Sequence, residues 1–107
     1  MMRKKLRYIL VETSRETNIE SLSDLEREFY RRMRFLIGDM NYHTVNPKII
    51  KFLNPRCFVL KVNLEGLPDA LLALALFKRF NGTDTAFWSI KISGTIKALG
   101  KKLSILG

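Results

Sequence analysis

The chain has 107 residues, 47% of them hydrophobic, which is enough for one modest hydrophobic core. Its net charge of +9 favours a polyanionic partner such as nucleic acid, although basic charge can also serve solubility alone. The single cysteine, Cys57, excludes an internal disulfide and a cysteine-based metal site. No run of the sequence approaches the ~20 apolar residues that span a bilayer. We therefore expect a cytoplasmic protein outside the membrane.

The N-terminal segment combines a basic arm with a strand. Residues 1–11 carry four basic residues and no acidic one, and residues 1–6 predict an arm. Residues 7–13 are rich in β-formers and predict the first strand. Alternation along this strand places its side chains on two faces. One face would hold Ile9 and Val11, and the other Tyr8, Leu10 and Glu12.

A helix is predicted over residues 23–37. Ser23 and Glu26 form a capping-box pattern, apolar residues recur at helical spacing, and Gly38 is a typical C-terminal stop. The arginines along this helix predict a solvated face. The residues after Gly38 predict a loop, and its histidine, His43, is expected at the surface because no nucleophile can be placed beside it.

The next two strands, residues 48–53 and 57–63, predict an antiparallel hairpin. The turn between them contains Pro55, which favours a turn and disfavours a central strand. In the second strand of the hairpin, Val59 and Lys61 would share one face, and the apolar residues that alternate with them would lie on the other face.

The second helix, predicted over residues 68–80, is apolar around nearly its whole circumference. Pro68 suits its first turn. A surface helix of a small domain cannot bury so much apolar area, so we expect a patch for a protein partner or for self-association. The alternative is that the C-terminal segment covers this patch.

The last strand, about residues 85–93, leads into a corner that begins at Ser93 and Gly94. Ser93 and Thr95 are natural N-cap residues, and a glycine allows a sharp turn. Backbone N–H groups at the start of the predicted terminal helix, residues 95–106, would suit a phosphate. The alternative is an ordinary corner that aims this helix back over the sheet.

The order strand, helix, strand, strand, helix, strand predicts an α+β fold of the ferredoxin-like (RRM-like) βαββαβ type, with an added C-terminal helix. We expect a single domain over residues 1–107, with the core over 7–93 and the terminal helix over 94–107. On the side of the sheet opposite to the two helices, the candidate surface residues are then Tyr8, Val59, Lys61, Phe87 and Lys91. Because Val59 and Lys61 stand where two stacking rings would be expected, base stacking at those two positions is disfavoured.

Three stretches of sequence carry a family resemblance. The basic arm leads into Arg7-Tyr8-Ile9-Leu10-Val11-Glu12, a Leu-Ala helix precedes the last strand, and the chain closes with Ile92-Ser93-Gly94-Thr95-Ile96-Lys97. Over residues 3–102 this resembles the archaeal ribonuclease P protein component 2 family, which is related to the smaller α/β subunits of eukaryotic ribonuclease P and MRP. The short terminal segment and the acidic loop at 16–20 depart from the family pattern.

The resemblance implies a protein subunit of the ribonucleoprotein that removes the 5′ leader from precursor tRNA. The ribonuclease P RNA would carry the active site and require magnesium, while this chain would bind no cofactor and supply no catalytic residue. A second protein, component 3, with a TIM-barrel-like fold, is implied as partner. Two such pairs can join through this chain, which implies a homodimer or a 2:2 heterotetramer.

Candidate contact residues follow from the charge pattern, the corner and the apolar helix. For RNA we assign Arg3, Lys4, Lys5, Arg7, Lys91, Gly94, Thr95, Lys97, Lys101 and Lys102. For protein contact we assign Leu72, Leu76, Phe77 and Phe80. Two alternatives stay open: a generic RNA-binding or ribosome-associated module, and a protein-binding adaptor without a processing role.

Overall fold

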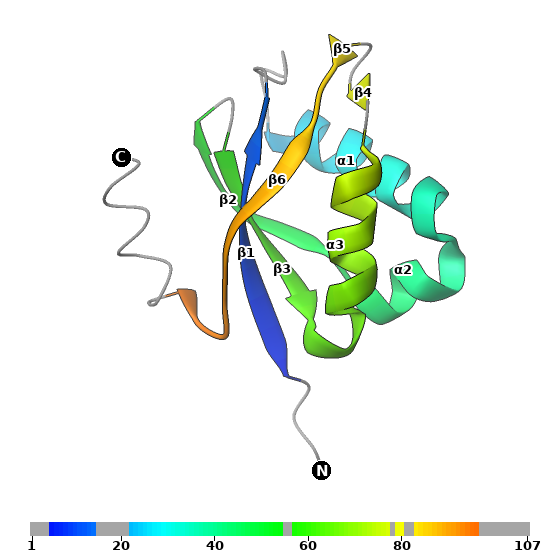
Figure 1. Cartoon of the computed structure of the whole chain (residues 1–107), viewed down its shortest axis with the longest axis vertical. Helices are drawn as coiled ribbons and strands as arrows, with labels where there is room; N and C mark the ends of the chain where they lie inside the picture. The colour runs from blue at the N-terminus through cyan, green and yellow to red at the C-terminus, as the bar shows by residue number, and fades with distance from the viewer. Residues whose placement is uncertain (1–4, 15–21, 55–56, 78, 81–82, 97–107) are drawn as a thin grey trace.

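The computed structural model describes residues 5–14, 22–54, 57–77, 79–80 and 83–96 (Figure 1). The elements in chain order are β1 (Leu6–Thr13), α1 (Leu22–Ile37), α2 (Asp39–Val45), β2 (Lys48–Asn54), β3 (Cys57–Asn63), the 3₁₀ turn η1 (Leu64–Gly66), α3 (Leu67–Leu76), β4 (Arg79–Phe80), β5 (Thr83–Asp84) and β6 (Phe87–Ser93). The predicted terminal helix beyond residue 96 and the first four residues of the arm lie outside the described residues.

The four long strands form an antiparallel sheet in the order β2-β3-β1-β6, and α1, α2 and α3 lie together on one side of it (Figure 1). This confirms the predicted α+β class and is consistent with the ferredoxin-like arrangement. Strands β1 and β3 occupy the centre of the sheet, so both edges of each are hydrogen-bonded to neighbouring strands. None of the described helices is long and apolar enough to cross a membrane.

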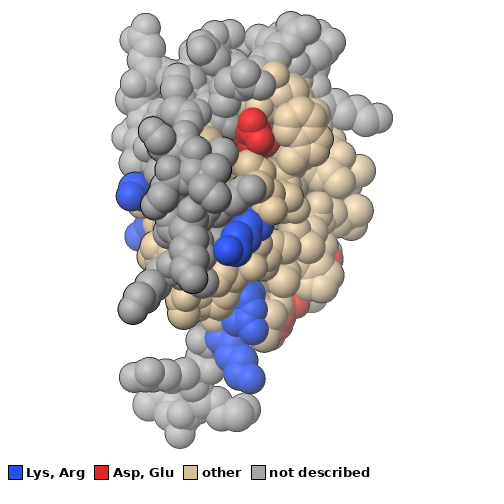
Figure 2. Space-filling view, turned by 60° about the vertical axis from the view of Figure 1, so that its left-hand side comes forward, with Lys and Arg blue, Asp and Glu red and all other residues tan. Residues whose placement is uncertain are grey.

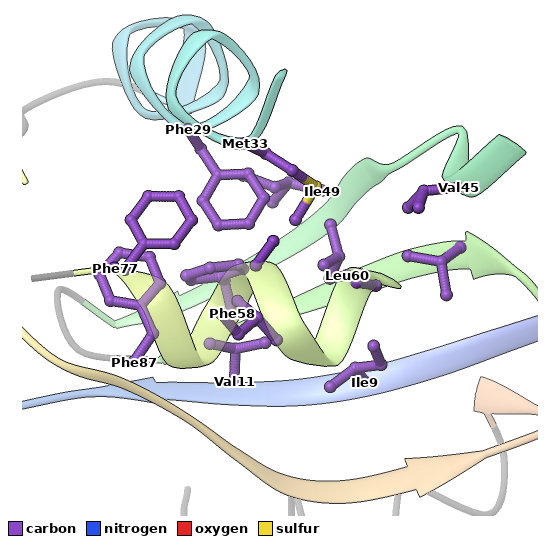
Figure 3. Close-up of a cluster of buried hydrophobic side chains, with 14 residues drawn as sticks. Ile9, Val11, Phe29, Met33, Val45, Ile49, Phe58, Leu60, Phe77 and Phe87 are labelled. Atoms are coloured by element: carbon purple, nitrogen blue, oxygen red, sulfur yellow. The ribbon is translucent and has the colours of Figure 1, made fainter. Parts of the chain in front are cut away.

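The core lies between the helices and the sheet. Alternation puts Ile9 and Val11 of β1 on the helix side, as predicted, together with Phe58 and Leu60 of β3. Aromatic rings from α1, β3, β6 and the residue that follows α3 fill one end of this layer, as Figure 3 shows: Phe29, Phe58, Phe87 and Phe77. The rings of Phe77 and Phe87 are stacked with centroids 4.5 Å apart, so α3 is held against β6 by ring contact.

Helix α2 replaces most of the predicted loop after α1. Gly38 ends α1 as predicted, with φ of 84°, and its carbonyl accepts the N–H of Tyr42 at the start of α2. The helix is stabilised by packing: Val45 is buried, and the Asn63 side chain donates to the carbonyl of Thr44. The sequence Asp-Met-Asn-Tyr-His-Thr-Val has weak helix propensity, so tertiary contacts decide its conformation.

Helix α3 ends four residues earlier than predicted. Phe77 takes an extended conformation, and its ring is 2% exposed in the aromatic core. Residues 79–80 then pair with 83–84 as the short hairpin β4-β5. Burying the Phe77 ring requires the chain to leave the helical path, which the apolar periodicity alone could not indicate.

Candidate nucleic-acid interface

The face of the sheet opposite α1, α2 and α3, called here the back face, carries its own small apolar cluster. Leu10, Cys57 and Val59 are buried there, and Tyr8 packs against them partly buried. Figure 2 shows basic side chains spread over this side of the molecule. The prediction that Tyr8, Val59 and Lys61 share this face is confirmed by their contacts and pairing register.

Cross-strand register arranges the back face in rows, because directly paired residues point to the same side of a sheet. One row, from β2 to β6, is Lys48, Lys61, Tyr8 and Ser93. The next row is Lys51, Val59, Leu10 and Lys91. A third row contains Cys57, Glu12 and Trp88. The face therefore combines four lysines and two aromatic rings with one acidic residue, a composition suited to phosphates and bases.

Two β-bulges create this composition. On β2, Ile49 pairs with Leu60 and Lys51 with Val59, so Ile50 is an extra residue. The bulge turns Lys51 onto the same face as Lys48, although a spacing of three would separate them in a regular strand.

The second bulge lies on β6, where Lys91 pairs with Leu10 and Ser89 with Val11, which leaves Ile90 as the extra residue. It brings Lys91 and Trp88 to one face in the same way. Strict alternation along the last strand therefore missed Trp88, and no face was assigned from the sequence to Lys48 and Lys51. Alternation also misplaced Phe87, which is 4% exposed in the helix-side core and is not on the back face.

The corner after β6 has the hydrogen bond of an N-cap, and the phosphate contact assigned to Gly94 and Thr95 stays a prediction. The Thr95 N–H donates to the Ser93 hydroxyl at 3.3 Å, so this donor already has a partner within the turn. Gly94 does not have a positive φ, and an added Cβ would lie 3.4 Å from the flexible end of Arg7. The glycine is therefore not required for the turn. The corner instead carries Ile96 to the edge of the back face.

The structure places the predicted RNA-binding residues in two groups. Lys5 and Arg7 lie at the start of β1, with Gly94 and Thr95 nearby because Tyr8 pairs with Ser93. Lys91 lies on the back face. The remaining predicted residues lie outside the described part of the chain: Arg3, Lys4, Lys97, Lys101 and Lys102.

The predicted protein-contact residues are only partly at the surface. Leu72 and Leu76 are 53% and 41% exposed on the outer side of α3. The assignment of Phe77 to protein contact is wrong, because its ring fills the core and is not available to a partner. Phe80 lies in β4 rather than in the helix, and its side chain is outside the described part of the structure.

The titratable side chains on the helix side form a solvated surface, as predicted for the arginine row. Arg31 pairs with Glu28 at 2.8 Å, and the Arg34 guanidinium donates to Asp39. The hydrogen bond and charge of Arg34 lower the pKa of the Asp39 carboxyl. His43 is exposed on α2, and no group of metal-ligating side chains occurs among the residues that the structure describes.

Cys57 is the single thiol of the chain, and the third back-face row contains it. It is 3% exposed, and burial, followed by the charge of Glu12, raises the pKa of its thiol. A raised pKa keeps the sulfur protonated at neutral pH, which makes it a poor nucleophile. Cys57 therefore acts as a small apolar residue beneath the basic surface.

A family model and a solved structure each match the chain over most of its length. A model of the Rpp14/Pop5 family matches residues 7–104 of the chain. Among solved structures, the chain is similar to a protein in the cryo-EM structure of yeast ribonuclease MRP, with a TM-score of 0.68 and 8% identity, over 99% of this chain and 93% of that one. At this identity the likeness shows the fold alone. No curated protein sequence matches the chain.

Proposed function

We propose a role in precursor-tRNA maturation on one premise: the chain belongs to the Rpp14/Pop5 family and is a protein subunit of a ribonuclease P/MRP-type ribonucleoprotein. Within such a particle, we assign it to binding and positioning the RNA that removes the 5′ leader. The observation that supports this role is the back face, where lysines from three strands surround apolar and aromatic side chains.

Phosphate neutralisation is the physical basis of the proposed role. Each lysine that contacts a phosphate releases condensed counterions, which favours binding and makes it depend on salt. A protein that neutralises phosphates lets RNA segments approach one another, so less magnesium is needed to fold the RNA. In this proposal the RNA holds the magnesium ions and performs the cleavage, and the chain contributes no reacting group.

A protein partner is the second part of the proposal. The outer side of α3 exposes Leu72, Ala75 and Leu76 without a charged residue among them. Apolar surface of this kind is typical of contact with another protein subunit. We propose that α3 binds the TIM-barrel-like component 3 and that the complex can be a 2:2 heterotetramer.

Reconstitution tests the proposed function. The chain and its partner are added to a cognate ribonuclease P RNA, and cleavage of precursor tRNA is measured at a magnesium concentration that is limiting for the RNA alone. We expect cleavage to increase severalfold. Absence of stimulation would count against the role in precursor-tRNA processing, and RNA binding that is independent of salt would favour the protein-binding adaptor.

A further inference from the structure

We propose that a hollow on the back face binds one unpaired nucleotide of the RNA, with its base on the Tyr8 ring and its phosphates at Lys51 and Lys61. This inference rests on the proposed function, because it names the site where such a particle's RNA would contact the chain. The hollow measures about 270 Å³, several times the ~30 Å³ that a water molecule occupies in the liquid. Its described lining is Tyr8, Ile50, Lys51, Val59, Lys61 and Ile96.

The floor and walls of the hollow suit a flat, apolar ring system. Val59 is buried at its base, while Ile50 and Tyr8 pack against the same cluster partly exposed. Ile96, 45% exposed, lines the hollow from the corner that follows β6. A nucleobase offers two apolar faces and stacks on a tyrosine ring regardless of its identity. An unpaired base is required, because the bases of a duplex are covered by their neighbours.

The charges around the hollow select a polyanion over an apolar protein segment. Lys51 and Lys61 line it, and Lys48 stands directly opposite Lys61 across the β2-β3 ladder. Like charges that are paired across strands repel each other, and a phosphate between them would relieve this repulsion. Among the described residues no carboxylate forms an ion pair with these three lysines. The acidic residue of this face, Glu12, lies in the row farthest from the hollow.

The β2 bulge is the structural device that builds the site. It adds Ile50 to the apolar floor and turns Lys51 toward the same side as Lys61. In a regular strand the lysine would point into the helix side of the sheet. The single bulge therefore supplies both an apolar wall, Ile50, and the proposed phosphate contact, Lys51. With Tyr8 as the stacking ring, the site does not need aromatic rings at positions 59 and 61.

Binding of short oligonucleotides to the full chain tests the site. A labelled oligouridylate and an RNA duplex of the same length are compared by fluorescence anisotropy. We expect the single strand to bind more tightly than the duplex. Tyr8→Leu, which keeps an apolar side chain but removes the ring, should weaken single-strand binding roughly tenfold. Tyr8→Phe keeps the ring and should bind within about twofold of the wild type.

The charge part of the site is tested separately with Lys61→Gln, which keeps most of the side chain's length. Losing one phosphate contact should reduce the slope of log affinity against log salt by about 0.7 for a single strand. Arg31→Gln is the matched control: it removes one positive charge on α1, on the other side of the molecule, and should leave the slope nearly unchanged. Because Lys61 is a surface charge, this variant tests the site even where Tyr8→Leu impairs folding.

Three results would overturn the nucleotide site. They are equal affinity for duplex and single strand, wild-type affinity in Tyr8→Leu, or an equal salt slope in Lys61→Gln and the wild type. These measurements do not use precursor tRNA or the partner protein. A chain that stimulates precursor-tRNA cleavage but gives any of these results would retain the proposed function and lose this site.

Discussion

At the scale of single residues, two glycines differ in how closely other parts of the chain approach them. Gly66 ends the turn η1 against α2, and a Cβ added there would lie 2.4 Å from the Cα of Val45, closer than any real contact. Since backbone must move to relieve this overlap, Gly66→Ala should lower the free energy of unfolding by about 1–3 kcal/mol. Urea denaturation of the purified chain measures this loss.

Gly94→Ala is the control for this prediction. Gly94 has no positive φ, and its nearest neighbour is the flexible end of the Arg7 side chain. The unfolding free energy should therefore change by no more than about 0.5 kcal/mol. A Gly66→Ala variant as stable as Gly94→Ala would show that α2 and η1 are not packed as described.

Single residues also show where the sequence could predict the candidate site. Tyr8 and Lys61 were placed correctly because β1 and β3 pair without a bulge between them and therefore alternate regularly. Lys91 was also placed correctly, but Lys51 and Trp88 join the back face only because of two bulges, which alternation cannot anticipate. Phe87 was misplaced because the extra residue Ile90 reverses the alternation along β6, so Phe87 faces Phe29 and Phe77 in the core instead of sharing a face with Lys91.

At the scale of elements, α3 presents the surface that we assign to a protein partner. Leu76 lies on its outer side, 41% exposed, so Leu76→Asp places a charge in the proposed interface without disturbing the core. Burying an unpaired carboxylate at an interface should reduce affinity for the partner by roughly 30-fold or more. Isothermal titration calorimetry with the partner measures the affinity, and circular dichroism checks that the variant is folded.

Phe35→Asp provides a matched control on another helix. Phe35 is 79% exposed on α1, so the same type of substitution is made at an apolar surface position outside α3. This variant should bind the partner like the wild type. Loss of binding in Phe35→Asp with normal binding in Leu76→Asp would place the protein interface on α1 instead.

The elements themselves were predictable where local signals agree. The predicted bounds of β3 agree with the structure, and those of β1, α1 and β2 differ from it by one residue at one end. The signals that predicted these elements are alternation, a capping box, a stop glycine and a turn proline. Helix α2 was not predictable, because its weak propensity is overcome by contacts with β3 and η1 that are remote in sequence. The end of α3 was not predictable because Phe77 leaves the helix to join a ring cluster built from three other elements.

At the scale of the whole molecule, the sheet separates two kinds of surface. Its helix side holds the aromatic core beneath α1 and α3, and on α1 Arg31 pairs with Glu28 and Arg34 with Asp39. Its back face holds lysines from β2, β3 and β6 over a thin apolar layer. Among the described residues, four lysines and one carboxylate therefore share the back face, and we propose that the chain contacts RNA with the sheet and a protein with α3.

Site-specific photocrosslinking in the assembled particle tests this division most directly. A photoreactive phenylalanine derivative is placed at Trp88, 50% exposed on the back face, or at Phe35, 79% exposed on α1, so both substitutions exchange one aromatic side chain for another. This division predicts crosslinks to the RNA from position 88 and none from position 35. Crosslinks to the RNA from position 35 and none from position 88 would contradict it.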